Sequence, residues 1–189
     1  MAIEIRRAVV DDWPAIREVR LEALSVAPLA FGSTLAREVA FPDSTWQQRA
    51  ESSLTFLARQ GTRVVGTATG LAEPESDTHT MSVVAMYVRA EARGTGCAHR
   101  LLDAVAEAAS ATGASWLRLD VTETNLAAVR CYRRHGFRET GRRRPLPHTP
   151  ELTEIEMTLE LGSDHPRPAV GRSCPQRTAR PMGTVRPRS

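Results

Sequence analysis

The feature that most restricts how this sequence can fold is a glycine-rich stretch between two long apolar patterns. Residues 93–98 read Arg-Gly-Thr-Gly-Cys-Ala, after a dense apolar run at 81–88 and before residues 98–113, where apolar residues recur at helical spacing. Glycine permits a sharp turn and a close approach to backbone N–H groups, and the start of a helix adds unpaired donors. The stretch is therefore either an anion site, most simply for a phosphate, or a tight strand-to-helix turn that binds nothing.

Length and composition favour one globular domain with a substantial core. The chain has 189 residues, of which 41% are hydrophobic and 25% charged. No apolar run approaches the roughly 20 residues of a membrane span, and no apolar signal segment follows the N-terminus. We therefore expect a cytoplasmic protein with no membrane partner.

Residue usage also excludes some chemistry. The three cysteines (Cys97, Cys131 and Cys174) have neither the spacing of a metal signature nor that of a disulfide framework, so we expect reduced thiols and no metal. The sequence has no lysine, which excludes a Schiff-base lysine and a phosphate-loop lysine.

The basic character of the chain lies in its C-terminal segment. Residues 162–189 contain six arginines, five prolines and one acidic residue, whereas residues 1–161 have a slight acidic excess. Few apolar residues are available there to form a core, so we expect a folded domain at 1–161 and a disordered tail at 162–189. An alternative reading is a nucleic-acid contact, but the tail lacks the aromatic residues that stack on bases, and we do not expect nucleic acid as a partner.

Apolar periodicity predicts an α/β (α+β) domain with a mixed, mainly antiparallel sheet of about seven strands flanked by helices. The segment 81–121 reads strand, loop, helix and strand, which indicates a right-handed crossover between parallel strands. The predicted strands are 3–9, 54–60, 63–72, 81–88, 115–122, 137–142 and 153–161; the predicted helices are 11–24, two pieces of 34–52 on either side of Pro42, 98–113 and 126–135.

Two motifs resemble those of the GCN5-related N-acetyltransferase (GNAT) family. The family places Arg/Gln-x-x-Gly-x-Gly/Ala after a strand that ends in valine, and here Val88 is followed by the stretch at 93–98. The second motif corresponds to Asn125, Ala128, Tyr132, Gly136 and Phe137. A nucleotide-binding Walker loop would need a lysine, and a dinucleotide fingerprint would need a glycine where His99 stands. The resemblance covers most of residues 3–161 and implies a GNAT fold with acetyl-CoA as co-substrate.

The resemblance also implies roles for individual residues. Tyr132 would be the general acid that protonates the leaving thiolate, and it would contact the cofactor together with Asn125, which we expect to cap its helix. Strands 81–88 and 116–121 would splay apart, so that the backbone of 86–88 could bind the pantetheine arm and supply an oxyanion donor. The expected cofactor-binding residues are Met86, Tyr87, Val88, Arg93, Gly94, Thr95, Gly96, Cys97, Ala98, Asn125 and Tyr132.

The general base and the acceptor remain open at this stage. Glu38, His79, Asp120 and Glu123 are candidate bases by rough position. The resemblance places the acceptor pocket near residues 25–50, with Phe31, Phe41, Trp46 and Glu38 as its expected lining. The acidic residues Glu73, Glu75 and Asp77 either attract a cationic amine or form a solvated turn.

We therefore expect an N-acetyltransferase that moves the acetyl group of acetyl-CoA to a primary amine. A small molecule, such as an amino acid, a polyamine or an antibiotic, is the first choice of acceptor, and a protein N-terminal or lysine amine is the second. The alternative function is a non-catalytic acyl-CoA-binding or regulatory module with a GNAT fold. Many members of the family are dimers, so a homodimer is also expected.

Overall fold

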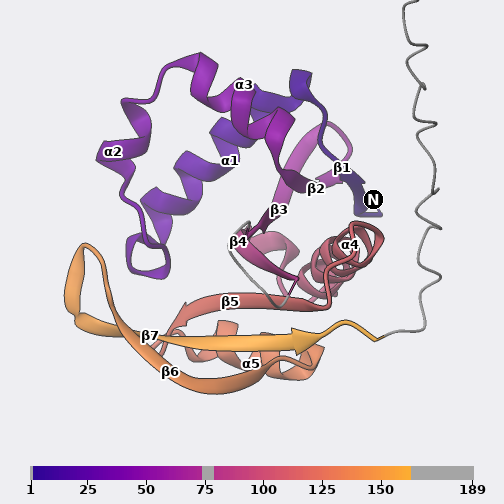
Figure 1. The fold of residues 1–189 in the computed structure, drawn as a ribbon. Coiled ribbons are helices and arrows are strands. Elements are labelled where there is room, and N and C mark those ends of the chain that lie inside the picture. The colour runs from indigo at the N-terminus through magenta and orange to yellow at the C-terminus, as the bar shows by residue number, and fades with distance from the viewer. Residues whose placement is uncertain (1, 74–78, 163–189) are drawn as a thin grey trace, which may run out of the picture.

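The protein folds around one seven-stranded sheet, seen in a computed structural model that describes residues 2–73 and 79–162 (Figure 1). The strand order is β1-β2-β3-β4-β5-β7-β6. The strands are β1 (Glu4–Arg7), β2 (Leu54–Gln60), β3 (Arg63–Ala72), β4 (Thr80–Val88), β5 (Trp116–Thr122), β6 (Arg138–Leu146) and β7 (Thr149–Glu160). Glu75, Asp77, Cys174 and the predicted tail beyond Gly162 lie outside the described residues.

Helices cover both faces of this sheet. They are α1 (Trp13–Val26), α2 (Leu35–Val39), α3 (Asp43–Ser52), α4 (Cys97–Ala111) and α5 (Leu126–His135), with short 3-10 turns η1 (Val10–Asp12), η2 (Pro28–Ala30) and η3 (Ala90–Ala92). β4 and β5 are parallel and joined through α4, while the other neighbouring pairs of described strands are antiparallel. The predicted sheet and its parallel crossover are thus confirmed. No helix within the described ranges is both long and apolar enough to cross a bilayer.

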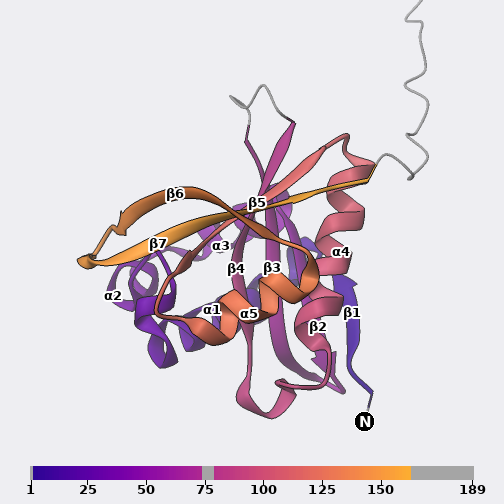
Figure 2. The ribbon, with the colours of Figure 1, turned by 90° about the horizontal axis from the view of Figure 1, so that it is seen from below.

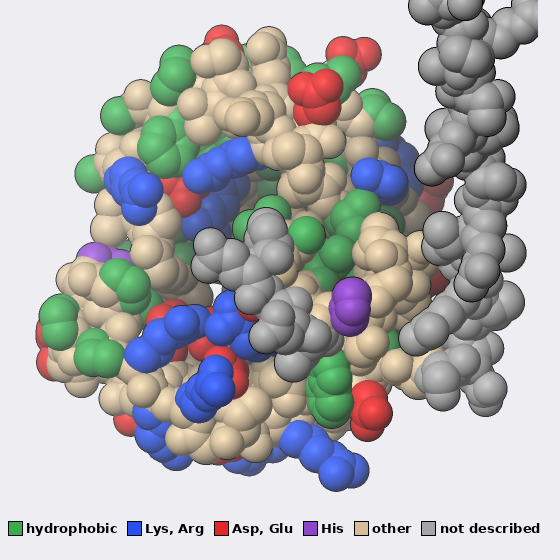
Figure 3. Space-filling model, viewed as in Figure 1, with side chains coloured by type: hydrophobic (Ala, Val, Ile, Leu, Met, Phe, Trp, Pro, Cys, Tyr) green, Lys and Arg blue, Asp and Glu red, His purple; other side chains and the backbone are tan. Residues whose placement is uncertain are grey.

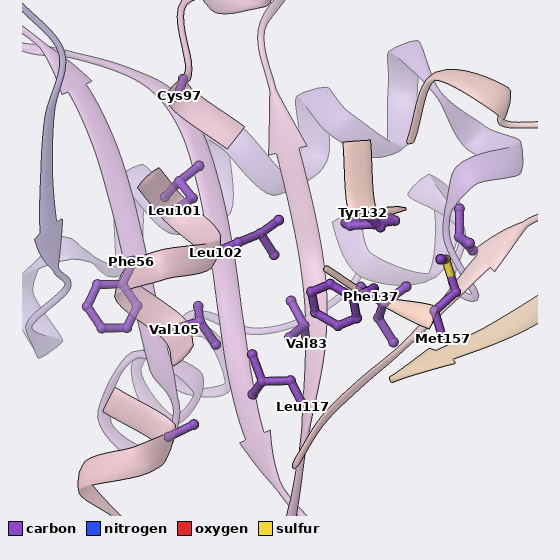
Figure 4. Packing of buried hydrophobic residues seen from close by; sticks show 14 of the residues in the cluster. Phe56, Val83, Cys97, Leu101, Leu102, Val105, Leu117, Tyr132, Phe137 and Met157 are labelled. Carbon is purple, nitrogen blue, oxygen red and sulfur yellow. The ribbon is translucent and has the colours of Figure 1, made fainter. Parts of the chain in front are cut away.

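Two hydrophobic clusters fix the helices on opposite faces of the sheet. On one face α4 buries Leu101, Leu102 and Val105, the residues that the sequence places at helical spacing (Figure 4). On the other face α1 and α3 pack Leu24 and the fully buried Trp46 against the sheet. Side chains that alternate along β2 and β3 supply both clusters, which is the period-2 pattern of a strand covered on two sides.

The β6–β7 hairpin is longer than the sequence predicts. The expected strands 137–142 and 153–161 extend to Arg138–Leu146 and Thr149–Glu160, although Pro145 and Pro150 lie inside them. Proline ends a strand in the middle of a sheet because it lacks an N–H donor, but it is tolerated in an edge strand or at a bulge. β6 is an edge strand, and its register shifts at Pro145 and Leu146.

One buried carboxylate joins the N-terminal elements. Asp12 accepts hydrogen bonds from Arg6 of β1, at 2.6 and 2.7 Å, and from Arg59 of β2, at 3.1 Å. It also accepts from the backbone N–H of Val9 at 2.9 Å, which fixes the entry into η1 and α1. The hydrogen bond from Arg6 is the main reason why the pKa of Asp12 is lowered to about 2.

Replacing Asp12 with asparagine should therefore lower the free energy of unfolding by about 1 to 2 kcal/mol at pH 7, a value reduced for the solvent near this group. A carboxylate with a depressed pKa in the folded state stabilises above its unfolded pKa and loses this effect as the pH falls toward 2. Urea unfolding of the wild type and Asp12→Asn at pH 7 and near pH 2 tests this. A difference in stability that persists unchanged near pH 2 would contradict it.

Candidate active site

The candidate site begins where β4 and β5 stop pairing. Thr80–Ser82 of β4 pairs with Trp116–Arg118 of β5, and no pair follows in the described structure. Figure 2 shows the two strands running apart beyond this point, with α5 on the side where they diverge. The side of residues 83–88 that faces β5 is therefore not covered by a strand, as the family resemblance implies.

A β-bulge lies on this uncovered part of β4. Ala85 has a φ of +52°, unusual for a residue other than glycine, and the register with β3 shifts between Thr67 and Thr69. The bulge changes the direction in which the backbone groups of the next residues point. Met86 and Val88 pack half-buried against the α4 cluster, whereas the hydroxyl of Tyr87 donates to Glu22 on the opposite face at 3.0 Å.

The glycine-rich stretch forms a loop of exposed backbone donors at the start of α4. Gly94 and Gly96 have φ values of +76° and +82°, and Gly96 is the N-cap of α4. In the described part of the chain, the backbone N–H groups from Gly94 to Ala98 have no protein acceptor. Thr95 instead uses its hydroxyl to hold the loop, donating to Ala92 at 2.7 Å. Such a run of N–H groups at the start of a 15-residue helix suits an anion.

Arg93 supports the loop from within. Its Nε donates to the carbonyl oxygen of Val88 at 3.0 Å, which ties the loop to the end of β4. Cys97 is buried, and burial raises the pKa of both its thiol and that of Cys131. Both thiols are therefore protonated at neutral pH, and Cys97 can contribute to an anion site through its backbone.

Tyr132 lies on α5, which begins and ends as the sequence predicts. The side-chain oxygen of Asn125 accepts from the N–H of Ala128 at 3.2 Å, and Gly136 closes the helix with a φ of +106°. The Tyr132 ring is buried and meets the ring of Phe137 edge-on, with centroids 5.8 Å apart (Figure 4). Its hydroxyl has no hydrogen-bond partner among the described residues, and burial raises its pKa, so the phenol stays protonated.

Two histidines link α5 to the first turn of α4. The Nδ1 atoms of His99 and His135 lie 3.1 Å apart. Burial lowers the pKa of His135, which keeps this imidazole neutral at neutral pH and allows a hydrogen bond between the two rings. The helix that carries Tyr132 is thereby held next to the donor loop.

A cavity of about 210 Å³ lies on the other face of the sheet, between the strands and helices α1–α3. Its lining includes Val84 and Ala85, so it reaches the bulge of β4. Of the expected lining residues, Trp46 and Glu38 line the cavity, whereas Phe31 and Phe41 lie against arginines rather than on its wall.

Glu38 is the centre of a cluster that joins three helices. It is 1% exposed and accepts from Arg20 of α1 at 2.7 and 3.1 Å and from Arg49 of α3 at 2.9 Å. Burial alone would raise the pKa of Glu38, but the hydrogen bonds from these arginines and Ser33 hold it below its usual value. Glu38 is thus a weak base.

The other candidate bases differ in their surroundings. His79 is exposed just before β4, at the end of that strand away from the bulge. Glu123 is paired with an arginine of β6 at 2.6 Å and is 44% exposed. Asp120 is bound by Arg144 through Oδ2, while its Oδ1 is buried without a protein partner in the described structure.

Some buried or paired charged residues were missed by sequence reasoning. No local pattern indicates a role for Arg20 and Arg49, because they lie 18 and 11 residues from Glu38 in the sequence and contact it only after folding. Glu154 of β7 is 8% exposed, and burial raises its pKa. Conversely, the carboxylate of Glu73 is paired with Arg118 at 2.6 Å and does not present a free charge to a cationic amine.

Comparison with known proteins identifies the fold. The model of the acetyltransferase (GNAT) family matches residues 13–137. The chain belongs to the GNAT family of acetyltransferases. No curated protein sequence matches it.

Solved GNAT structures share this architecture. The YncA protein of Salmonella typhimurium, solved with its cofactor acetyl-CoA, has 20% identity and a TM-score of 0.71 over 90% of this chain and 100% of that one. A GCN5-related N-acetyltransferase from Kribbella flavida has 27% identity and a TM-score of 0.67, covering 85% and 98%. The ribosomal-protein-S18-alanine N-acetyltransferase of Escherichia coli has 19% identity and a TM-score of 0.62, covering 87% and 99%. The GNAT fold expected from the sequence is confirmed.

The Glu38 cluster should contribute strongly to stability. Replacing Glu38 with glutamine leaves the largely buried Arg20 without its counter-charge, so we expect a loss of about 3 kcal/mol in urea unfolding. Glu123→Gln is the matched control, because it breaks an exposed pair and should cost less than about 1 kcal/mol. Equal losses in the two variants would show that the Glu38 pair has no special role.

Proposed function

We propose that this GNAT acetyltransferase transfers the acetyl group of acetyl-CoA to the primary amine of a small molecule. The observation that carries the proposal is the donor loop at 94–98, which begins α4 directly beside the uncovered part of β4. YncA, which shares this fold, was solved with acetyl-CoA, and this supports the same co-substrate here. The cytoplasmic location and the homodimer stay predictions.

The chain offers acetyl-CoA two kinds of backbone contact. The N–H groups of residues 94–98 would bind the pyrophosphate, with Gly94 and Gly96 allowing its close approach, whereas the N–H of Arg93 donates to Ala90 at 3.2 Å. The backbone of residues 86–88 would bind the pantetheine arm, because this length of β4 has no strand partner on that side in the described structure. Asn125, next to the start of α5, would contact the arm as well. An N–H group of β4 near the bulge would stabilise the oxyanion.

Tyr132 would act on the sulfur. Its ordinary pKa of about 10 is already above that of a thiol, about 8.5, and burial raises it further. The phenol is therefore protonated and can donate a hydrogen bond to the departing sulfur. As the C–S bond breaks, Tyr132 would give its proton to the sulfur, and the proton lost by the acetylated nitrogen would restore the phenol.

The acceptor amine must lose a proton before or during its attack. Among the four candidate bases, Asp120 keeps one carboxylate oxygen, the buried Oδ1, without a protein partner in the described structure, while Arg144 binds its Oδ2. The cavity of about 210 Å³ is smaller than the roughly 300–1,000 Å³ of typical drug-sized sites, which favours a small acceptor over a protein chain.

The cofactor site is tested by a pair of glycine variants. Gly96 and Gly113 both have positive φ values, at opposite ends of α4, and a Cβ added at either would meet no atom of the described residues within 4 Å. Glutamate at either position costs about 1 to 2 kcal/mol of backbone strain. At Gly96 it also puts a negative side chain where the pyrophosphate would lie.

Acetyl-CoA at about 100 times its Kd should stabilise the wild type by about 2.7 kcal/mol, seen as a rise in melting temperature. We expect the rise to persist in Gly113→Glu and to be lost in Gly96→Glu. An equal rise in both variants would place the cofactor elsewhere, and no rise in the folded wild type would argue against acetyl-CoA.

The two tyrosines of the chain allow a matched test of the leaving-group step. Tyr132→Phe should lower kcat by about 10²- to 10⁴-fold. It should leave the melting temperature nearly unchanged, because the lost hydroxyl has no partner in the described structure. Tyr87→Phe removes a hydroxyl that binds Glu22 on the other face and should keep kcat. Steady-state thiol release gives both values. Equal kcat in wild type and Tyr132→Phe would remove Tyr132 from the mechanism, whereas no thiol release from the folded wild type with any amine would favour a non-catalytic acyl-CoA-binding module.

A further inference from the structure

The cavity beside the β4 bulge carries an excess of positive charge. Among the described residues that line it, Arg20, Glu38 and Arg49 are the charged ones, which gives a net charge of +1. A single arginine would neutralise Glu38 and still join two helices. The second arginine therefore adds a positive charge that Glu38 does not neutralise.

Two residues that line this cavity each carry a buried donor without a partner in the described structure. Arg20 uses Nε and Nη2 on Glu38, and its Nη1 is buried without a protein partner in the described structure. The indole N–H of Trp46, whose side chain is fully buried, also lacks one. An unsatisfied buried donor is costly, so donors without partners indicate a site for a ligand that accepts hydrogen bonds.

The two guanidinium groups are held in place before any ligand binds. Arg20 lies over the ring of Phe31 at 4.8 Å, and Arg49 lies over Phe41 at 4.8 Å and Trp46 at 5.1 Å. Their common partner Glu38 fixes them from the other side. Rigid, planar forks of this kind suit carboxylate oxygens.

From this arrangement we propose that the acceptor is an amine that also carries a carboxylate, as a free amino acid does. The proposal rests on the proposed acetyl transfer. The carboxylate binds Arg20 and Arg49, and the amine lies at the other end of the cavity, where Val84 and Ala85 meet the proposed thioester site. One carboxylate, with a charge of −1, balances the net +1 of the lining, which a polyamine would not. Figure 3 shows basic side chains over α1–α3 and over the β6–β7 side of this face, with acidic side chains beside both groups.

The test is a comparison of matched acceptors. Each common L-amino acid is assayed beside its amide and its decarboxylated amine, with acetyl-CoA and thiol release as the readout. We expect kcat/KM for the best amino acid to exceed that of both analogues by about 10- to 100-fold, the range for a charge-assisted hydrogen bond to a buried group. If the acid, the amide and the amine are all acetylated with equal kcat/KM, the carboxylate site is wrong. The proposed acetyl transfer is not contradicted by that result.

Arg49 is the residue to change, because it is 43% exposed and Arg20 still holds Glu38 when it is removed. Arg49→Met should bring the ratio of acid to amide close to one, and Arg49→Lys should restore part of it. Arg37→Met is the control: Arg37 is exposed on α2 and does not line the cavity, so the ratio should not change. A loss of turnover in Arg49→Met that affects acid and amide equally would mean a structural role and would contradict the proposal.

A binding measurement without turnover distinguishes the proposed carboxylate site from the proposed acetyl transfer. The melting temperature is measured with each amino acid and its amide, with and without CoA. A rise with the acid but not the amide, absent in Arg49→Met, supports the carboxylate site even if no amine is acetylated. If neither ligand raises the melting temperature in a protein that binds CoA and acetylates no amino acid, the carboxylate site is wrong.

Discussion

The parallel ladder between β4 and β5 ends after Ser82 and Arg118, and the geometry of the site follows from where it ends. Two strands can separate inside a sheet if each is held firmly on its other side. β5 pairs with β7 along its whole length, from Trp116 to Thr122, and β4 pairs with β3 to its last residue. The sheet therefore stays intact while it exposes backbone groups of β4. The bulge at Ala85 then turns these groups, and the ladder with β3 resumes at Tyr87.

The two faces of the opened region have different chemistry because β5 alternates. Leu119 and Val121 are buried in the apolar cluster that also holds Tyr132 and Phe137. Neighbouring positions carry polar groups: Arg118 pairs with Glu73 and Glu156, and Asp120 pairs with Arg144. The gap between the backbones of β4 and β5 therefore has the buried Tyr132 phenol, a proton donor, on one side. Fixed ion pairs lie on the other side. The buried phenol and the ion pairs do not depend on each other, and both lie where β4 and β5 separate.

The parts of this site that the sequence predicts are local in the chain. The glycine loop, the Asn125 cap and the Gly136 stop each depend on contacts within a few residues, so their patterns can be read directly. The extent of β6 was missed because Pro145 reads as a strand breaker until the strand is known to be at the edge. The Glu38 cluster could not be predicted, since three short helices must first pack before Arg20 and Arg49 meet it. Glu38 looked like a candidate base for the same reason: its partners cannot be seen in the sequence.

The position of the bulge relates the two proposed ligands to each other. The donor loop at 94–98 and the buried Tyr132 belong to α4 and α5, whereas the arginines of the cavity belong to α1 and α3 on the opposite face. Ala85 lies on the strand between these two groups of helices and lines the cavity itself. Two anionic ligands held by separate sets of N–H donors would repel each other if they shared one pocket. Binding them from opposite faces keeps the phosphates and the carboxylate apart, so that the acyl carbon and the amine can approach each other at β4. A cofactor and an acceptor of like charge thus fit a sheet that opens in the middle better than a single cleft.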